Sequence, residues 1–203
     1  MVEKMKSPRV EYFKKNMRGR CLDLGCDFGK LHALIDNGEI IGLDILTEHY
    51  KERVIRGNVL QMPLKGGSFD TIVAGEIIEH MPKPELLLAE CQRALKKGGI
   101  LMLSTPNRGA WSNRLFHRFD NASPKSEYPH QSVMNEKEFR ELCGKFFSVR
   151  EFMLLPYDEV SSPNRYTQGG MKIANAYYWL RKAVQHIMPR GLREEMVAKL
   201  EKK

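Results

Sequence analysis

The sequence predicts an α/β fold, a three-layer sandwich with a mostly parallel central sheet. Short apolar runs with the length of buried strands recur through residues 19–104 and alternate with helical or turn-forming segments. The first run leads into a glycine turn at residues 23–29, and the second ends in the carboxylate of Asp44. In open sheets of this class, ligands bind beyond the carboxyl ends of the strands. The pattern therefore places a ligand site at that edge.

The expected elements follow in order along the chain. A short helix over residues 8–17 precedes the first strand. Strands are expected near residues 19–24, 39–44, 53–57, 70–74 and 99–104. The clearest amphipathic helix, residues 85–95, begins after two prolines and stops at Gly98. A helix over 135–143 and a strand over 146–155 come after it.

The chain divides into two expected parts. Residues 1–160 form the main domain, and residues 161–203 are predicted to be a C-terminal helical appendage. Within the appendage, residues 171–188 carry apolar side chains at helical spacing with basic residues around them. Such a helix packs on its own domain or on another subunit, or it makes peripheral contact with a membrane interface.

The composition limits which classes of function are expected for this chain. The formal net charge of +8 leaves nucleic-acid binding open, but the basic residues are spread along the chain, so it is not favoured. The four cysteines show no CxxC spacing, which disfavours a zinc site or a disulfide framework. No apolar run is long enough to span a membrane, and the first residues lack a signal-peptide core. A cytoplasmic location is expected.

The glycine turn indicates a cofactor that contains a nucleoside. Gly25 and Gly29 permit close backbone approach, and Asp44 is spaced to accept hydrogen bonds from a ribose. A dinucleotide fingerprint needs three glycines spaced G-x-G-x-x-G, and Asp27 stands where the middle glycine would be. The acidic turn disfavours a pyrophosphate and suits an amine-bearing ligand, so an NAD(P)-dependent oxidoreductase is the weaker alternative.

Residues 19–107 resemble the class I S-adenosylmethionine-dependent methyltransferases, which have a Rossmann-like fold. The matching segments are the turn after Asp23, the Asn58-Val59 pair, the strand into Gly75 and the Gly98-Gly99 turn; the sequence departs from the family at Asp27. The resemblance implies S-adenosylmethionine as cofactor. The implied cofactor-binding residues are Asp23, Gly25, Cys26, Gly29, Asp44, Ile45, Asn58, Val59 and Gly75.

The segment Glu76-x-x-Glu79-His80 directly follows the fourth strand, where a transferred methyl group would emerge. Two carboxylates and an imidazole suit a divalent cation such as magnesium, and His80 alone could act as a base toward an acceptor hydroxyl. A third interpretation leaves Glu76 as a cofactor contact and gives Glu79 and His80 a local structural role. These alternatives stay open on the residues alone.

The segment Glu76 to His80, followed by Ser104 to Arg108, resembles the ubiquinone-biosynthesis O-methyltransferases of the methyltransferase type 11 group. Some of those enzymes use the two glutamates and the histidine as metal ligands, which here are Glu76, Glu79 and His80. Small-RNA 2′-O-methyltransferases share the segment and add a distant histidine, for which His130 is the best candidate and His117 the next. Ser7-Pro8-Arg9 resembles a leading segment whose arginine touches the cofactor in the quinone enzymes.

The expected activity is transfer of a methyl group to a small-molecule or lipid-like acceptor at oxygen. His80, Glu76 and His130 are the expected catalytic residues, and a loop over residues 105–135 is expected to meet the acceptor. An N-methyltransferase and an RNA 2′-O-methyltransferase are the alternatives within the family. A non-catalytic protein that binds a nucleoside cofactor is the alternative from another class.

Overall fold

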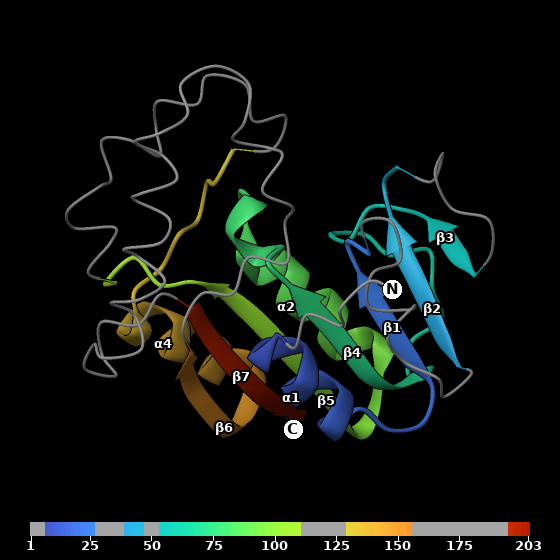
Figure 1. Cartoon of the computed structure of the whole chain (residues 1–203). Coiled ribbons are helices and arrows are strands. Elements are labelled where there is room, and N and C mark those ends of the chain that lie inside the picture. The colour runs from blue at the N-terminus through green and yellow to red at the C-terminus, as the bar shows by residue number, and fades with distance from the viewer. Residues whose placement is uncertain (1–6, 27–38, 47–52, 111–128, 156–194) are drawn as a thin grey trace, which may run out of the picture.

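The computed structural model describes residues 7–26, 39–46, 53–110, 129–155 and 195–203 (Figure 1). Within these residues seven strands form one sheet in the order β3-β2-β1-β4-β5-β7-β6. The strands are β1 (Cys21–Leu24), β2 (Ile40–Asp44), β3 (Val54–Arg56), β4 (Phe69–Gly75), β5 (Leu95–Pro106), β6 (Phe147–Leu155) and β7 (Glu195–Lys202). The strands β1 to β5 are parallel, and β7 runs antiparallel to both β5 and β6.

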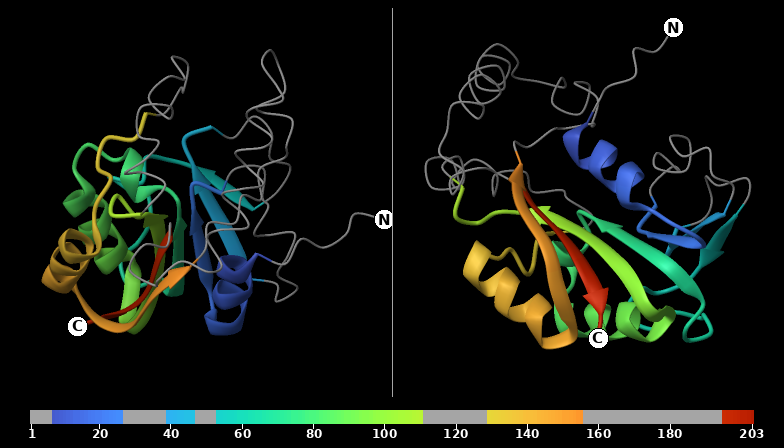
Figure 2. Two further views of the ribbon diagram at one scale, coloured as in Figure 1. Left: turned by 60° about the vertical axis from the view of Figure 1, so that its left-hand side comes forward. Right: turned by 90° about the horizontal axis from the view of Figure 1, so that it is seen from below.

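Helices cover both faces of the sheet. The helices are α1 (Pro8–Asn16), α2 (Pro84–Ala94) and α4 (Glu136–Phe146), and a short 3-10 turn, η3, spans Ile78–His80. Figures 1 and 2 show α1 against one face and α2 with α4 against the other. The predicted α/β sandwich with a mostly parallel sheet is therefore confirmed.

Two apolar layers match this arrangement. Phe13 of α1 packs with Val73, Met102 and Val197 on one face of the sheet. The larger layer lies under α2 and α4, where Leu88 and Phe139 meet strand residues that are fully buried. β4 and β5 contribute to both layers, since buried parallel strands are apolar on both faces. This packing fixes the position of the carboxyl ends of the parallel strands, where the candidate functional site lies.

The predicted helical appendage is wrong for residues 195–202. These residues form β7, which lies inside the main sheet between β5 and β6. Met196, Val197, Ala198 and Leu200 are buried, and the neighbouring strands pair with β7 on both sides. A segment buried on both faces and paired along both edges is stabilised as a strand, whatever its intrinsic helix propensity. The helix expected over 171–188 and the boundary at residue 160 lie outside the described residues.

No helix among the described residues is both long and apolar enough to cross a lipid bilayer.

Candidate functional site

Gly25, in the turn after β1, contacts both the end of β2 and the segment that follows β4. Gly25 has φ of +63°, and a Cβ built there would lie 2.8 Å from Cδ1 of Ile77, just beyond β4. Its N–H donates to the carbonyl oxygen of Leu43 in β2 at 2.9 Å. A side chain at this position would be both strained and obstructed, so glycine is required. The predicted cofactor turn therefore starts where β1, β2 and the segment after β4 meet; Gly29 lies outside the described residues.

Two acidic residues, Asp23 and Asp44, lie at the carboxyl ends of the neighbouring strands β1 and β2. Asp23 is buried, and burial together with the nearby charge of Asp44 raises the pKa of Asp23 to about 8. Oδ1 of Asp44 accepts a hydrogen bond from the Leu46 N–H at 3.0 Å. The side chain of Ile45 is 54% exposed, while Cys26 is buried. The structure thus places Asp23, Cys26, Asp44 and Ile45 around one edge of the sheet.

Asn58 and Val59, two of the implied cofactor-binding residues, lie in the loop after β3. Oδ1 of Asn58 accepts from the Leu60 N–H at 2.9 Å, which leaves the amide nitrogen of this exposed residue for other contacts. Val59 is 8% exposed and belongs to the main apolar layer. The loop is joined to the end of β2 by the Gly57 N–H, which donates to the Asp44 carbonyl oxygen at 2.9 Å.

Glu76 contacts Arg9 of α1 and Ser104 of β5 through its carboxylate. Its backbone is left-handed, with φ of +53°, which is unusual for a residue with a Cβ. Its Oε1 accepts from Ser104 Oγ at 3.1 Å and lies 3.3 Å from Nη1 of Arg9. Burial raises the pKa of Glu76 well above its ordinary value, and the charges of Glu79 and Glu195 raise it further. Strained backbone of this kind is concentrated at functional sites.

Glu79 is buried in η3 and is held on two sides. Its Oε2 accepts from Thr105 Oγ1 at 3.0 Å, and burial raises its pKa to about 7. Its carbonyl oxygen accepts from the N–H groups of Gln131 at 2.7 Å and Ser132 at 2.9 Å. These bonds dock residues 129–134 onto η3 and carry His130 to the site.

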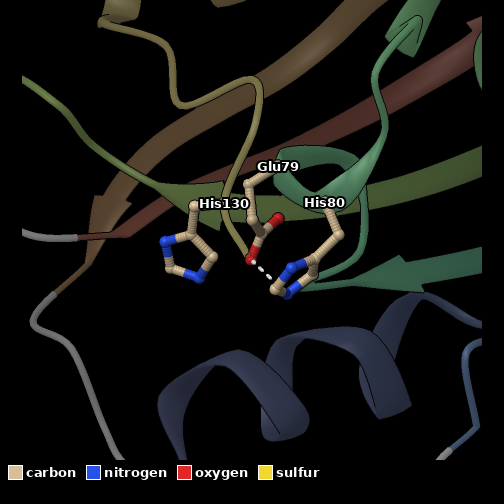
Figure 3. Close-up of side chains that lie close together, drawn as sticks. All are labelled: Glu79, His80 and His130. Carbon is tan, nitrogen blue, oxygen red and sulfur yellow. Dashed lines mark ion pairs between the residues drawn. The ribbon is translucent and has the colours of Figure 1, made fainter. Parts of the chain in front are cut away.

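Glu79, His80 and His130 form a compact group at this position. Their potential ligand atoms all lie within 4.8 Å of one another, and Figure 3 shows the Glu79 carboxylate between the two imidazole rings. Nε2 of His80 lies 3.9 Å from Oε1 of Glu79. Within the described part of the chain, His80 Nδ1 is buried without a hydrogen-bond partner. The structure therefore brings Glu79 and His80 together with His130, while Glu76 is engaged by Arg9 and Ser104 instead.

One residue that contacts Arg9 in the candidate site is not predicted from the sequence. Glu195, the first residue of β7, is 1% exposed, and its Oε1 lies 2.7 Å from Nη1 of Arg9. Burial raises the pKa of Glu195, and Arg9 opposes that rise. The two residues are 186 positions apart in sequence. No local pattern signals such a pair, because it depends on the strand order of the folded sheet.

Comparison with known proteins agrees with these motifs. Residues 2–146 match the model of a family described as "Methyltransferase domain". A probable S-adenosylmethionine-dependent methyltransferase of Mycolicibacterium smegmatis is 33% identical over 119 residues, which are 51% of this chain and 46% of that protein. A ubiquinone biosynthesis O-methyltransferase of Xanthomonas euvesicatoria is 29% identical over 121 residues, 49% of each chain.

A likeness to a solved structure supports the fold. A Thermotoga maritima structure described as a methyltransferase, possible histamine N-methyltransferase, superposes with a TM-score of 0.65 at 21% identity, covering 96% of this chain and 88% of that one. The chain spans about half the length of the curated relatives it matches. With the family model covering most of the chain, the protein belongs to the S-adenosylmethionine-dependent methyltransferase family that its motifs resemble.

Proposed function

We propose that the chain moves a methyl group from S-adenosylmethionine to a small-molecule or lipid-like acceptor, at an oxygen atom, with help from a divalent cation. The observation that carries this proposal is the group of Glu79, His80 and His130. Two of its members belong to η3, which directly follows Ile77, the residue that contacts Gly25 of the expected cofactor turn. The sulfonium of the cofactor supplies an already activated methyl group. The protein's contribution is then to align the acceptor and to accept its proton.

The strand ends fit the cofactor. Gly25 gives the left-handed turn at the end of β1, and Asp44 offers a carboxylate at the end of β2 for the ribose. Asn58 and Val59 would meet the adenine. The methionine end of the cofactor would then lie toward Gly75, beside which Arg9 carries a guanidinium that suits a carboxylate. Gly29 completes the expected set of contacts.

The same group of side chains fits a divalent cation. One carboxylate and two imidazoles are a common ligand set for such ions, and the potential ligand atoms of the three side chains lie within 4.8 Å of one another. Glu79, His80 and His130 would hold the ion, which would supply Lewis acidity toward an acceptor hydroxyl. Glu79, already buried and fixed by Thr105, supplies the negative charge.

The name of a relative and the side chains at this edge bear on the choice of acceptor. The Xanthomonas relative is named as a ubiquinone biosynthesis O-methyltransferase, and a hydroxyl acceptor loses a proton that a metal ion or His80 helps to remove. An amine acceptor is the second candidate, since three carboxyl groups, Glu76, Glu79 and Glu195, gather at this edge and would favour a cation. An amine would need no metal.

Calorimetric titration of S-adenosylhomocysteine, alone and with manganese, tests the proposal. We expect micromolar binding of the nucleoside that Asp44→Ala abolishes. Manganese binding should be lost in Glu79→Gln and kept in Glu141→Gln, which removes an exposed carboxylate of α4. Absence of nucleoside binding would overturn the cofactor assignment. Manganese binding that survives Glu79→Gln would overturn the metal site.

An acceptor screen completes the test. Catechols, quinols and hydroxylated lipids are incubated with radiolabelled S-adenosylmethionine, beside an amine series that includes histamine. Methylation of hydroxyl compounds that a chelator stops and manganese restores supports the proposal. Chelator-resistant methylation confined to amines would select the second candidate.

A further inference from the structure

Glu195 is the first residue of β7, the last described strand. It places a buried carboxyl group at the edge of the sheet where the parallel strands end. Because β7 runs antiparallel, its first residue lies where the parallel strands end: Glu195 pairs with Pro106 of β5 and with Leu155 of β6. Its side chain is 1% exposed, so its charge requires a partner. The family model ends at residue 146, so this carboxyl group lies outside the matched segment.

The partner of Glu195 is Arg9, in the first turn of α1. The guanidinium nitrogen Nη1 lies 2.7 Å from Oε1 of Glu195 and 3.3 Å from Oε1 of Glu76. Arg9 is thus shared between two carboxyl groups, and the contact with Glu195 is the shorter.

We propose that Glu195 is a positioning residue, which holds the Arg9 guanidinium so that its other donors face the carboxylate of the cofactor's methionine. This inference rests on the proposed function, since it presumes that S-adenosylmethionine binds beside Arg9. A planar guanidinium presents five donors in a fixed fork, so one edge can be anchored by Glu195 while another meets the ligand.

Attachment of α1 to the sheet does not account for this pair. Phe13 already packs α1 into an apolar layer. Further along the helix, Tyr12 Oη donates to Glu151 at 2.9 Å, and Lys199 Nζ donates to Asn16 Oδ1 at 2.8 Å. A buried ion pair adds little net stability, because removing both charges from water offsets their attraction. The geometry is instead what an anchored ligand-binding arginine requires.

The test compares two ligands by calorimetry. S-adenosylhomocysteine carries the amino-acid carboxylate, whereas 5′-methylthioadenosine shares the adenosine and the sulfur but lacks it. Glu195→Ala should weaken S-adenosylhomocysteine by about tenfold, the scale of one lost hydrogen bond to a charged group, and change 5′-methylthioadenosine by less than about twofold. Glu195→Gln, which keeps an oxygen acceptor for Arg9, should show a smaller loss confined to the same ligand. The Gln variant also serves if the Ala variant fails to fold.

Two controls make the result decisive. Glu151→Ala breaks the links at the other end of α1 and should leave both affinities within about twofold. In an Arg9→Ala background, Glu195→Ala should cause no further loss, because the residue it positions is gone.

Each contrary result has its own meaning. Equal weakening of both ligands by Glu195→Ala would make Glu195 merely structural, and unchanged or tighter S-adenosylhomocysteine binding would show that Arg9 needs no anchor; either overturns the inference. If the unmodified protein binds neither ligand, the proposed function itself has failed.

Discussion

At the scale of single residues, Glu76 combines a strained backbone with a contact to Arg9, whose guanidinium also contacts Glu195. Its left-handed φ of +53° costs about 1–2 kcal/mol for a residue with a Cβ. That conformation directs the carboxylate to Arg9 and Ser104 rather than to the group around Glu79. The two Glu residues of the Glu-x-x-Glu-His segment therefore have different partners, Arg9 and Ser104 for Glu76 and Thr105 for Glu79.

The strain at position 76 is measurable with two variants that both lack the carboxylate. Glu76→Gly should unfold with a free energy about 1 kcal/mol greater than Glu76→Ala, because glycine adopts a positive φ without cost. Urea denaturation followed by circular dichroism gives the difference. A reference pair is Ala89→Gly in α2 against the unmodified protein, where the helix should favour alanine by a similar amount. Equal stabilities at position 76 would show that the left-handed backbone carries no strain.

Asp23 should make stability depend on pH. Its folded-state pKa of about 8 lies above its ordinary value of 3.8, so the folded protein keeps a proton that the unfolded chain releases. The resulting stabilisation is full below pH 3.8 and is lost as the pH rises to about 8. Asp23→Asn removes this loss, so the ligand-free variant should melt at a higher temperature than the unmodified protein at pH 8.

The comparison for Asp23 is Asp70, whose pKa is lowered by Lys96. The stabilisation from Asp70 is present above its unfolded pKa, so Asp70→Asn should melt no higher at pH 8 than the unmodified protein. Thermal scans at pH 6, 7 and 8 supply both comparisons. A melting temperature of Asp23→Asn that stays below the unmodified protein at pH 8 would contradict the assigned direction.

At the scale of elements, the start of α4 fixes the segment that carries His130. Asn135 Oδ1 accepts from the Glu138 N–H at 3.1 Å, and Glu138 Oε2 accepts from the Asn135 N–H at 3.0 Å. This capping box follows directly on residues 129–134, which η3 holds through the Glu79 carbonyl. One end of the His130 segment is therefore anchored to a helix and the other to the site.

Loss of this cap should be local and moderate. Asn135→Ala removes the acceptor and should lower the free energy of unfolding by about 1 kcal/mol, whereas Asn135→Ser, which can still cap, should lose much less. Urea denaturation measures both variants. Similar losses for Ala and Ser would show that the side-chain cap does not stabilise α4.

The sequence predicts those elements whose pattern is local. The parallel strands, α2 and the glycine turn at Gly25 are predicted from apolar runs and from the glycines and prolines that bound them. The structure confirms these elements. β7 lies within residues 161–203, which the sequence predicts to be a helical appendage. Tertiary pairing on both edges decides its structure. In the candidate site, too, groupings of adjacent residues are predictable from the sequence, and contacts between distant elements are not.

Adjacent residues such as Glu79 and His80 can be predicted to act together, and His130 was added through the family resemblance. The pairing of Arg9 with Glu195 could not be predicted, since it joins the first described helix to the last strand. The left-handed backbone of Glu76 could not be predicted either, because no glycine or asparagine marks it.

At the scale of the whole molecule, the candidate site draws on α1, β1, β2, β4 and β7, which together span the described chain. Unfolding of any of them removes part of the site, so the ligand should bind only the folded protein. At a free S-adenosylhomocysteine concentration of 100 times its Kd, the free energy of unfolding should rise by about 2.7 kcal/mol. Thermal scans over a ligand series test this, with Asp44→Ala as control. A melting temperature independent of ligand concentration would contradict it.

The place of β7 in the sheet also has a consequence for synthesis on the ribosome. The strand that separates β5 from β6 is translated after both of them, so the growing chain holds two strand edges whose shared neighbour has not yet been made. Exposed edges of this kind invite pairing with other chains. The Arg9–Glu195 contact joins the first described helix to that late strand, and it is therefore among the last features of the site that a newly made protein can acquire.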